Sequence, residues 1–399
     1  MPTPILAAIL PLAVAFLTTF LLVPPVRRFA TEWRLGDKPN GRKLHAHSIP
    51  HLGGIAIFGG FFLAMLVLLA TPFGMPQAAR VLALLPGLLI LFGLGLVDDL
   101  RGLRAGVKLT YQLLGAVCVV AMGAGLRVGG VVDVALLPLV GLSVLWYVGV
   151  CNSVNLIDGL DGLAAGTSAI AAAAFLVIGV AVGDAAVVLV AMSLIGALLA
   201  FLRYNFHPAR IFMGDTGSMF IGFTLAFLAC LLAQRVGFWP ALLGSVAILG
   251  VPILDTATAI LRRLAARQHI FTADGEHTHH KLIRIGLSHR SSVLLLYVVA
   301  AVFACIGSGI LLGNTGLFVW AFGLGMGVTV SVTLLARRTR PSAVSRHAID
   351  QPVVAPQPTV APETGVVAGR VVPVARPAKR QPQETEVLEE VPPAVSTRR

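Results

Sequence analysis

The sequence predicts an all-α fold, a polytopic bundle of about eleven transmembrane helices, on three observations. Hydrophobic residues make up 57% of the chain and charged residues only 12%, against about 25% charged residues in soluble domains. Apolar runs near the length of about 20 residues that a bilayer-crossing helix needs recur along the chain. Basic residues gather in alternate loops between these runs. Lipid is therefore the expected solvent, and the net charge of +12 does not indicate nucleic-acid binding.

The apolar runs define the expected spans, and several are rich in glycine, as helices packed inside a bundle can be. The runs centre on residues 4–23, 52–70, 81–97, 108–124, 135–151, 163–182, 184–201, 218–234, 238–260, 291–312 and 314–336. No basic segment precedes the first run, so we expect an uncleaved span there. Residues 1–336 then form a membrane domain. Residues 337–399, rich in Pro, Val, Arg and Glu, are expected to be a disordered cytoplasmic tail.

The loops sort by charge. Most basic residues outside the tail lie in four loops, at residues 24–51, 98–108, 202–217 and 261–290. The loops on the other side hold only Arg80, Arg127 and Arg235. The positive-inside rule places the basic loops in the cytoplasm, and an odd number of spans then puts the N-terminus outside and the C-terminus inside.

Most acidic residues outside the tail fall on the same side, and carboxylates near membrane depth are costly and usually functional. The first acidic motif is Asp98-Asp99, followed by Lys108, in DDLRGLRAGVK. Adjacent carboxylates repel each other unless a cation or proton lies nearby, and a divalent metal or the lysine could supply that charge. The alternative is a solvated acidic pair at the end of a helix.

The second motif, NLIDGLDG, contains Asn155, Asp158 and Asp161. Positions three apart share a helical face, and oxygen ligands of this kind suit Mg²⁺. A calcium loop of the EF-hand type is not expected, because its twelve-residue pattern and final Glu are missing. A structural turn in which an Asp caps the next helix is the alternative.

The third motif, FMGDTGS, places Asp215 just before the eighth span. Glycine allows close backbone approach and a helix N-terminus favours anions, so the segment suits a phosphate site in which Asp215 is free to hold a metal. A plain N-cap by Asp215, Thr216 or Ser218 is the alternative.

The largest cytoplasmic loop contains DGEHTHHK, with His277, His279 and His280. A zinc site is not favoured, because no cysteine or suitably spaced carboxylate completes a tetrahedral set. A histidine cluster beside acidic motifs favours a pyrophosphate clamp, and a solvated loop is the alternative. The first basic loop, with Lys43, would attract anionic lipid headgroups, although ordinary topology determinants would look similar.

Together, DDLRGLRAGVK, NLIDGLDGLAAG, NFHPARIFMGDTGS and DGEHTHHKLIRIG resemble the polyprenyl-phosphate N-acetylhexosamine-1-phosphate transferase family, glycosyltransferase family 4, over residues 5–336. The resemblance implies that a UDP-N-acetylhexosamine donates its sugar-1-phosphate to undecaprenyl phosphate with release of UMP. It implies a requirement for Mg²⁺, with Mn²⁺ as an alternative. It also implies a bacterial inner-membrane enzyme with a cytoplasmic active site that starts cell-envelope polysaccharide synthesis. The HxHH pattern resembles the GlcNAc-1-phosphate branch more than the phospho-MurNAc-pentapeptide branch, which usually shows three consecutive histidines.

The resemblance also implies a role for each motif. The residues that would hold Mg²⁺ are Asn155 and Asp215. The residues that would contact the substrates are Lys43, Lys108, His277, His279 and His280. The catalytic candidates are Asp98 and Asp99, near the lipid phosphate, and Asp158 and Asp161, in the nucleotide and metal region. The lipid phosphate is already anionic at pH 7, so positioning and charge neutralisation can supply most of the catalysis, and a role for Asp98 as a base stays open.

Two other classes of protein fit the sequence less well. A CDP-alcohol phosphotransferase would carry Ala-Arg shortly after an Asp-Gly pair, and no Ala-Arg follows Asp158-Gly159 here. A secondary transporter would place its charges near the bilayer midplane, where only Asp255 is expected, with Arg262 or Arg263 as its partner. A homodimer is one assembly that the sequence allows.

Overall fold

The computed structural model describes residues 3–33, 35–37, 49–72, 74–126, 137–269, 277–316, 319–320, 323, 327, 364–367 and 370–373. The chain divides into two compact units, Met1–Ile349 and Asp350–Arg399. In the second unit the described residues form an antiparallel hairpin of β3 (Thr364–Val367) and β4 (Arg370–Pro373). Most of the expected disordered tail lies outside the described residues, so its disorder stays a prediction.

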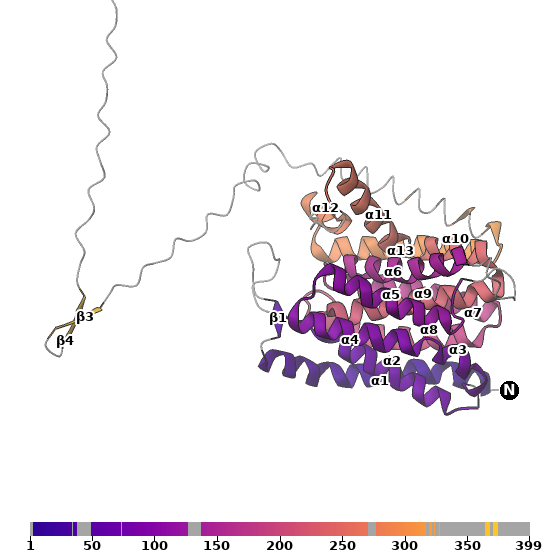
Figure 1. The fold of residues 1–399 in the computed structure, drawn as a ribbon, viewed down its shortest axis with the longest axis horizontal. Coiled ribbons are helices and arrows are strands. Elements are labelled where there is room, and N and C mark those ends of the chain that lie inside the picture. The colour runs from indigo at the N-terminus through magenta and orange to yellow at the C-terminus, as the bar shows by residue number, and fades with distance from the viewer. Residues whose placement is uncertain are drawn as a thin grey trace, which may run out of the picture. The chain divides into compact units, whose positions relative to one another are not determined.

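The first unit is a bundle of helices that lie roughly side by side (Figure 1). The helices that are long and apolar enough to cross a membrane are α1 (Thr3–Glu32), α6 (Leu137–Ile157), α7 (Leu163–Ala181), α8 (Ala185–Asn205), α9 (Gly214–Val236) and α13 (His289–Leu311). The shorter apolar helices are α2 (Gly53–Leu69) and α5 (Ala105–Ala121). The short elements of the connecting loops are β1 (Gly36–Asp37), β2 (Ile49–Pro50), η1 (Met75–Gln77) and α12 (Thr278–Arg284).

Two further helix pairs bend sharply. In the first pair, η1 and α3 (Ala78–Leu82) together meet α4 (Leu85–Arg101) at 51°, and in the second α10 (Phe238–Ile248) meets α11 (Gly250–Ala265) at 82°. The run at 238–260 is expected to be one helix, but Pro252 has no N–H to donate to the carbonyl of Ile248, which favours a break there. The described residues thus contain six candidate spans, or up to eight if each bent pair is one span. A multi-pass helical membrane protein is confirmed, whereas the count of eleven and the orientation of the termini stay predictions.

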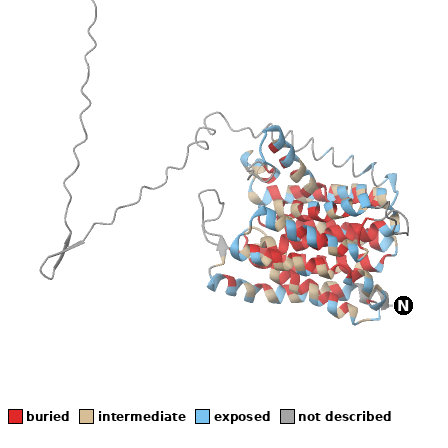
Figure 2. Cartoon of the chain, in the orientation of Figure 1, coloured by how far each residue is buried: buried red, intermediate tan, exposed pale blue. Residues whose placement is uncertain are grey.

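Helix α9 forms the centre of the bundle (Figure 2). The apolar stretch of α9 that is long enough to cross a membrane is completely buried, whereas only 22% of the corresponding stretch of α1 is buried. It packs against α2, α4, α6 and α10. Two glycines allow the closest of these approaches. A Cβ at Gly54 would lie 2.2 Å from the nitrogen of Gly217, and one at Gly95 would lie 2.5 Å from the Cα of Thr216. The first turn of α9 is therefore held directly against α2 and α4.

Candidate active site

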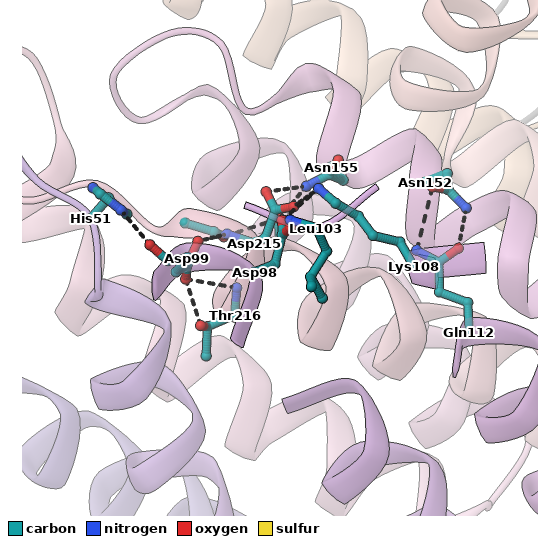
Figure 3. A network of polar contacts seen from close by, with 12 residues as sticks. His51, Asp98, Asp99, Leu103, Lys108, Gln112, Asn152, Asn155, Asp215 and Thr216 are labelled. Carbon is teal, nitrogen blue, oxygen red and sulfur yellow. Dashed lines mark hydrogen bonds and ion pairs between the residues drawn. The ribbon is translucent and has the colours of Figure 1, made fainter. Parts of the chain in front are cut away.

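A polar network forms where α4 and α6 end and where α5 and α9 begin (Figure 3). Lys108 Nζ lies 2.5 Å from Asp98 Oδ2 and 2.6 Å from Asp215 Oδ2. Asn155 Nδ2 donates to Asp215 Oδ1 at 2.9 Å and to Ser218 Oγ at 2.9 Å. Residues of three separate sequence motifs, predicted to act together, thus meet around one carboxylate, that of Asp215.

Asp99 holds the first turn of α9. Its Oδ1 accepts from the Asp215 nitrogen at 2.7 Å, and its Oδ2 accepts from the nitrogen and Oγ1 of Thr216 at 3.1 and 2.5 Å. The first N–H groups of a helix have no partner within the helix, so Asp99 caps α9 from another helix. A Cβ at Gly214, where φ is +72°, would lie 2.5 Å from Asp99 Oδ2. The GDTGS glycine therefore makes room for the carboxylate that fixes Asp215.

His51 joins the network, although it was not predicted as a site residue. Its Nε2 lies 2.9 Å from the carbonyl oxygen of Asp99 and donates to it. A signal was present, because His51 stands two residues before Gly53-Gly54, whose nitrogens bond the carbonyls of Phe212 and Met213 ahead of α9. His51 therefore belongs to the contacts that join the first loop to α4 and α9.

The charge balance of the network fits a divalent cation. Asp98, Asp99 and Asp215 contribute carboxylates, and Lys108 contributes the one ammonium group among the described residues of the network. Carboxylate and amide oxygens are ligands that Mg²⁺ accepts. Asp215, with the amide oxygen of Asn155, could therefore hold the ion that the motifs predict.

Asp158 lies in the turn that follows α6 and is half-buried. Burial raises the pKa of this carboxyl to about 7, and the negative charges of Asp215, Asp99 and Asp161 add to the effect. Asp158 therefore changes charge close to neutral pH, and its charge is coupled to the network around Asp215.

Asp161 faces a second cluster. Its Oδ2 accepts from the nitrogen of Ala209 at 3.0 Å and lies 2.7 Å from His207 Nδ1. The rings of His207 and His289 stack at 4.2 Å with 18° between their planes. The ligand atoms of Asp161, His207 and His289 lie within 4.8 Å of one another, so the group could hold a metal. Lone pairs of stacked imidazoles lie in nearly parallel planes, so a bound ion would require one ring to turn.

The histidines of the DGEHTHHK motif lie at the start of α12. His279 is 2% exposed, and its ring contacts Gly159, where a Cβ would lie 2.6 Å from His279 Nε2. Burial and the neighbouring His280, 4.3 Å away between ring centroids, lower the pKa of His279 to about 4. His279 is therefore neutral at pH 7 and can act through hydrogen bonds. Lys43 lies outside the described residues.

Comparison with known proteins agrees with the motifs. A family model described as Glycosyl transferase family 4 matches residues 81–233. A probable undecaprenyl-phosphate N-acetylglucosaminyl 1-phosphate transferase of Bacillus subtilis (strain 168) is 38% identical over 73% of this chain and 81% of its own length. A decaprenyl-phosphate N-acetylglucosaminephosphotransferase of Mycobacterium tuberculosis (strain ATCC 25618 / H37Rv) is 35% identical over 73% of this chain and 79% of its own.

A relative with a different named substrate is also similar. The phospho-N-acetylmuramoyl-pentapeptide-transferase of Moorella thermoacetica is 35% identical over 75% of this chain and 97% of its own length. Both kinds of relative are similar to about three quarters of this chain at comparable identity, so identity alone does not choose the sugar.

Proposed function

We propose that this chain, which belongs to glycosyl transferase family 4, transfers GlcNAc-1-phosphate from UDP-GlcNAc to undecaprenyl phosphate and releases UMP. An oxygen of the lipid phosphate attacks the phosphorus that carries the sugar. The bond between this phosphorus and the bridging oxygen of UMP breaks, and UMP leaves with that oxygen. The product is a lipid-linked sugar diphosphate, which starts a cell-envelope polysaccharide. The observation that carries the proposal is the network around Asp215 in a chain of this family.

The network brings two anionic substrates together. Lys108 supplies a fixed positive charge for a phosphate, and Asp99 fixes the position of Asp215 through the backbone of α9. Asp215 and Asn155 would hold Mg²⁺, which when bound neutralises phosphate charge. The lipid phosphate needs little deprotonation, so Asp98 acts by orienting Lys108 and, through the Leu103 nitrogen at 2.6 Å, the turn after α4.

The reaction takes place at the cytoplasmic face of the bacterial inner membrane. The network lies at the ends of α4, α5, α6 and α9 next to the basic loops, which the positive-inside rule assigns to the cytoplasm. Arg80 and Arg235, two of the few basic residues expected outside, both contact Asp184 and therefore lie together. The sorting of the loops thus agrees with the packing of the helices.

A donor screen tests the function. Purified protein, undecaprenyl phosphate and either UDP-GlcNAc, UDP-GalNAc or UDP-MurNAc-pentapeptide are incubated with Mg²⁺ or with excess EDTA, and UMP is measured. We expect UMP from UDP-GlcNAc only when lipid and Mg²⁺ are both present. Release from UDP-MurNAc-pentapeptide alone would assign the peptidoglycan branch instead. Substrate counterflow in sealed vesicles without UMP would indicate a transporter.

A further inference from the structure

Asp255 is an acidic residue in the apolar first half of α11, and it is 4% exposed. A carboxylate in such a place is costly unless it is well bonded. The partners that the structure gives it lie on the cytoplasmic loop and not on its own helix, where Arg262 and Arg263 were expected to pair with it. This bonding connects a membrane helix to the histidine motif.

Both oxygens of Asp255 are used. Oδ1 accepts from the nitrogen of Thr278 at 2.8 Å and from its Oγ1 at 2.7 Å. Oδ2 lies 2.7 Å from His277 Nδ1. Three bonds from one carboxylate therefore fix two consecutive residues at the start of α12, in the way that Asp99 fixes the start of α9.

The next residue in the chain, His279, is held between this anchor and the turn of the NLIDGLDG motif. Its ring lies parallel to that of His277, with 5° between the planes and 5.7 Å between centroids. Its Nε2 faces Gly159, beside Asp158, and makes no hydrogen bond to the described residues. The orientation of a neutral imidazole decides what it can bond, so the anchor sets what His279 offers to a ligand.

Packing alone does not fix this region. A cavity of about 190 Å³ adjoins the anchor. It is lined by Asp255, Thr258, Thr278 and His279, and by apolar side chains of α6, α7, α11 and α13. Side chains beside a cavity lack contacts on that side, so α12 has room to shift when the bonds to Asp255 are lost.

We infer that Asp255 is a positioning residue for the sugar-nucleotide donor, which acts by holding His277 and Thr278 so that His279 faces the Asp158-Gly159 turn. The inference rests on the proposed role of His279 in donor binding. It predicts an effect on the donor and not on the lipid, because the lipid phosphate is assigned to the separate network around Asp98 and Lys108.

The test compares the purified wild-type chain with Asp255→Ala, Asp255→Asn and Asp184→Ala, by UMP release at varied UDP-GlcNAc and varied undecaprenyl phosphate. Asp255→Ala should raise the KM for UDP-GlcNAc about tenfold and leave the KM for the lipid within about twofold. Asp255→Asn should have a donor KM between those of the wild type and Asp255→Ala, because its amide oxygen still accepts from Thr278. Asp184→Ala, a carboxylate anchor at the other end of the bundle, should lower thermal stability with both KM values unchanged.

A loss of stability in Asp255→Ala with an unchanged donor KM would overturn the inference, because that pattern is the one expected of Asp184→Ala. If Asp255→Ala does not fold, Thr278→Val offers a milder test, because it removes only the Oγ1 bond. It should raise the donor KM about threefold. An unchanged donor KM in Thr278→Val would also overturn the inference. His279→Ala separates the two hypotheses. If that variant leaves the donor KM unchanged, His279 does not bind the donor and the inference is overturned while the proposed function stands. If the wild type releases no UMP from UDP-GlcNAc, it is the proposed function that has failed.

Discussion

The two ends of α9 carry polar clusters of similar parts but opposite charge balance. Asp215 in the first turn belongs to a network of three carboxylates and one lysine. Arg235 in the last turn belongs to a cluster of one carboxylate, Asp184, and two arginines. Twenty residues of helix separate the two clusters, which is about 30 Å. A comparison of the clusters shows which charges stabilise the fold and which are available for chemistry.

In the Asp184 cluster, both oxygens of the carboxylate have hydrogen-bond donors. The carboxylate is fully buried, accepts two hydrogen bonds from Arg80 at 3.0 and 2.8 Å and one from Arg235 at 2.9 Å, and caps α8 through the nitrogen of Val187. Burial favours the neutral acid, but the hydrogen bonds from Arg80 and Arg235 prevail and hold the pKa of Asp184 below its ordinary value. The Asp215 network has more carboxylates than cations, which suits a site that binds a metal and phosphates.

The largest effect is expected from Asp215→Ala. The variant removes the carboxylate that bonds both Lys108 and Asn155, so UMP release should fall on the order of a thousandfold, as when a group that stabilises transition-state charge is lost. Asp184→Ala is the matched control and should keep the activity of each folded molecule within about threefold. Equal activity losses in the two variants would show that the charge balance does not separate the clusters.

Asp184→Ala should have the larger effect on stability. It leaves two arginines without their shared carboxylate and removes the cap of α8, so the free energy of unfolding should fall by about 2 kcal/mol. Thermal unfolding in detergent measures the change. Asp184→Asn should recover part of it, because its amide oxygen can still accept from an arginine and from Val187. If Asp184→Ala is as stable as the wild type, the cluster does not stabilise the fold as proposed.

A smaller effect is expected from the amide pair one turn away from the Asp215 network. Asn152 Nδ2 donates to Gln112 Oε1 at 2.7 Å, which joins α5 to α6 one turn from Lys108 and Asn155 (Figure 3). Gln112→Leu should lower kcat about fivefold through a shift of Lys108 relative to Asn155. Thr110→Ala, on the exposed side of α5, should leave kcat unchanged. An unaltered kcat in Gln112→Leu would mean that helix packing alone sets the distance between Lys108 and Asn155.

Much of the fold could be predicted because lipid imposes simple rules on length and polarity. The expected runs from 4–23 to 291–312 each overlap a helix. The break between α10 and α11 was missed because an apolar run of 23 residues satisfies the length rule, whatever bend Pro252 introduces. Hydropathy describes how apolar a segment is, whereas a bend depends on backbone hydrogen bonds that hydropathy does not measure.

The candidate site was predictable in its parts and not in its connections. The motifs identified Asp98, Asp215 and Asn155, which the structure brings together. They did not show that Asp99 caps α9 or that Asp255 anchors α12, because both bonds join segments far apart in the sequence. His207, inside the NFHPARIFMGDTGS motif, and His289, outside the motifs, were missed because nothing in the sequence indicates that they lie beside Asp161.

The smallest predicted effect concerns Asp158, whose pKa is raised from the ordinary 3.8 to about 7. The folded protein holds this proton more tightly than the unfolded chain, so the contribution of Asp158 to stability decreases as pH rises through this interval. Above pH 7 the ionised carboxyl adds negative charge beside Asp215, so the apparent affinity for Mg²⁺ should rise only about twofold between pH 6 and 8.

Mg²⁺-dependent UMP release at the two pH values measures this effect. Asp158→Asn should show a smaller rise in affinity, because its amide does not ionise. The loss of stability in Asp184→Asn should be the same at both pH values, since that carboxyl stays ionised throughout. An equal rise in Mg²⁺ affinity with and without the Asp158 carboxyl would show that its charge does not reach the metal site. The carboxylate excess near Asp215 would then comprise only Asp98, Asp99 and Asp215.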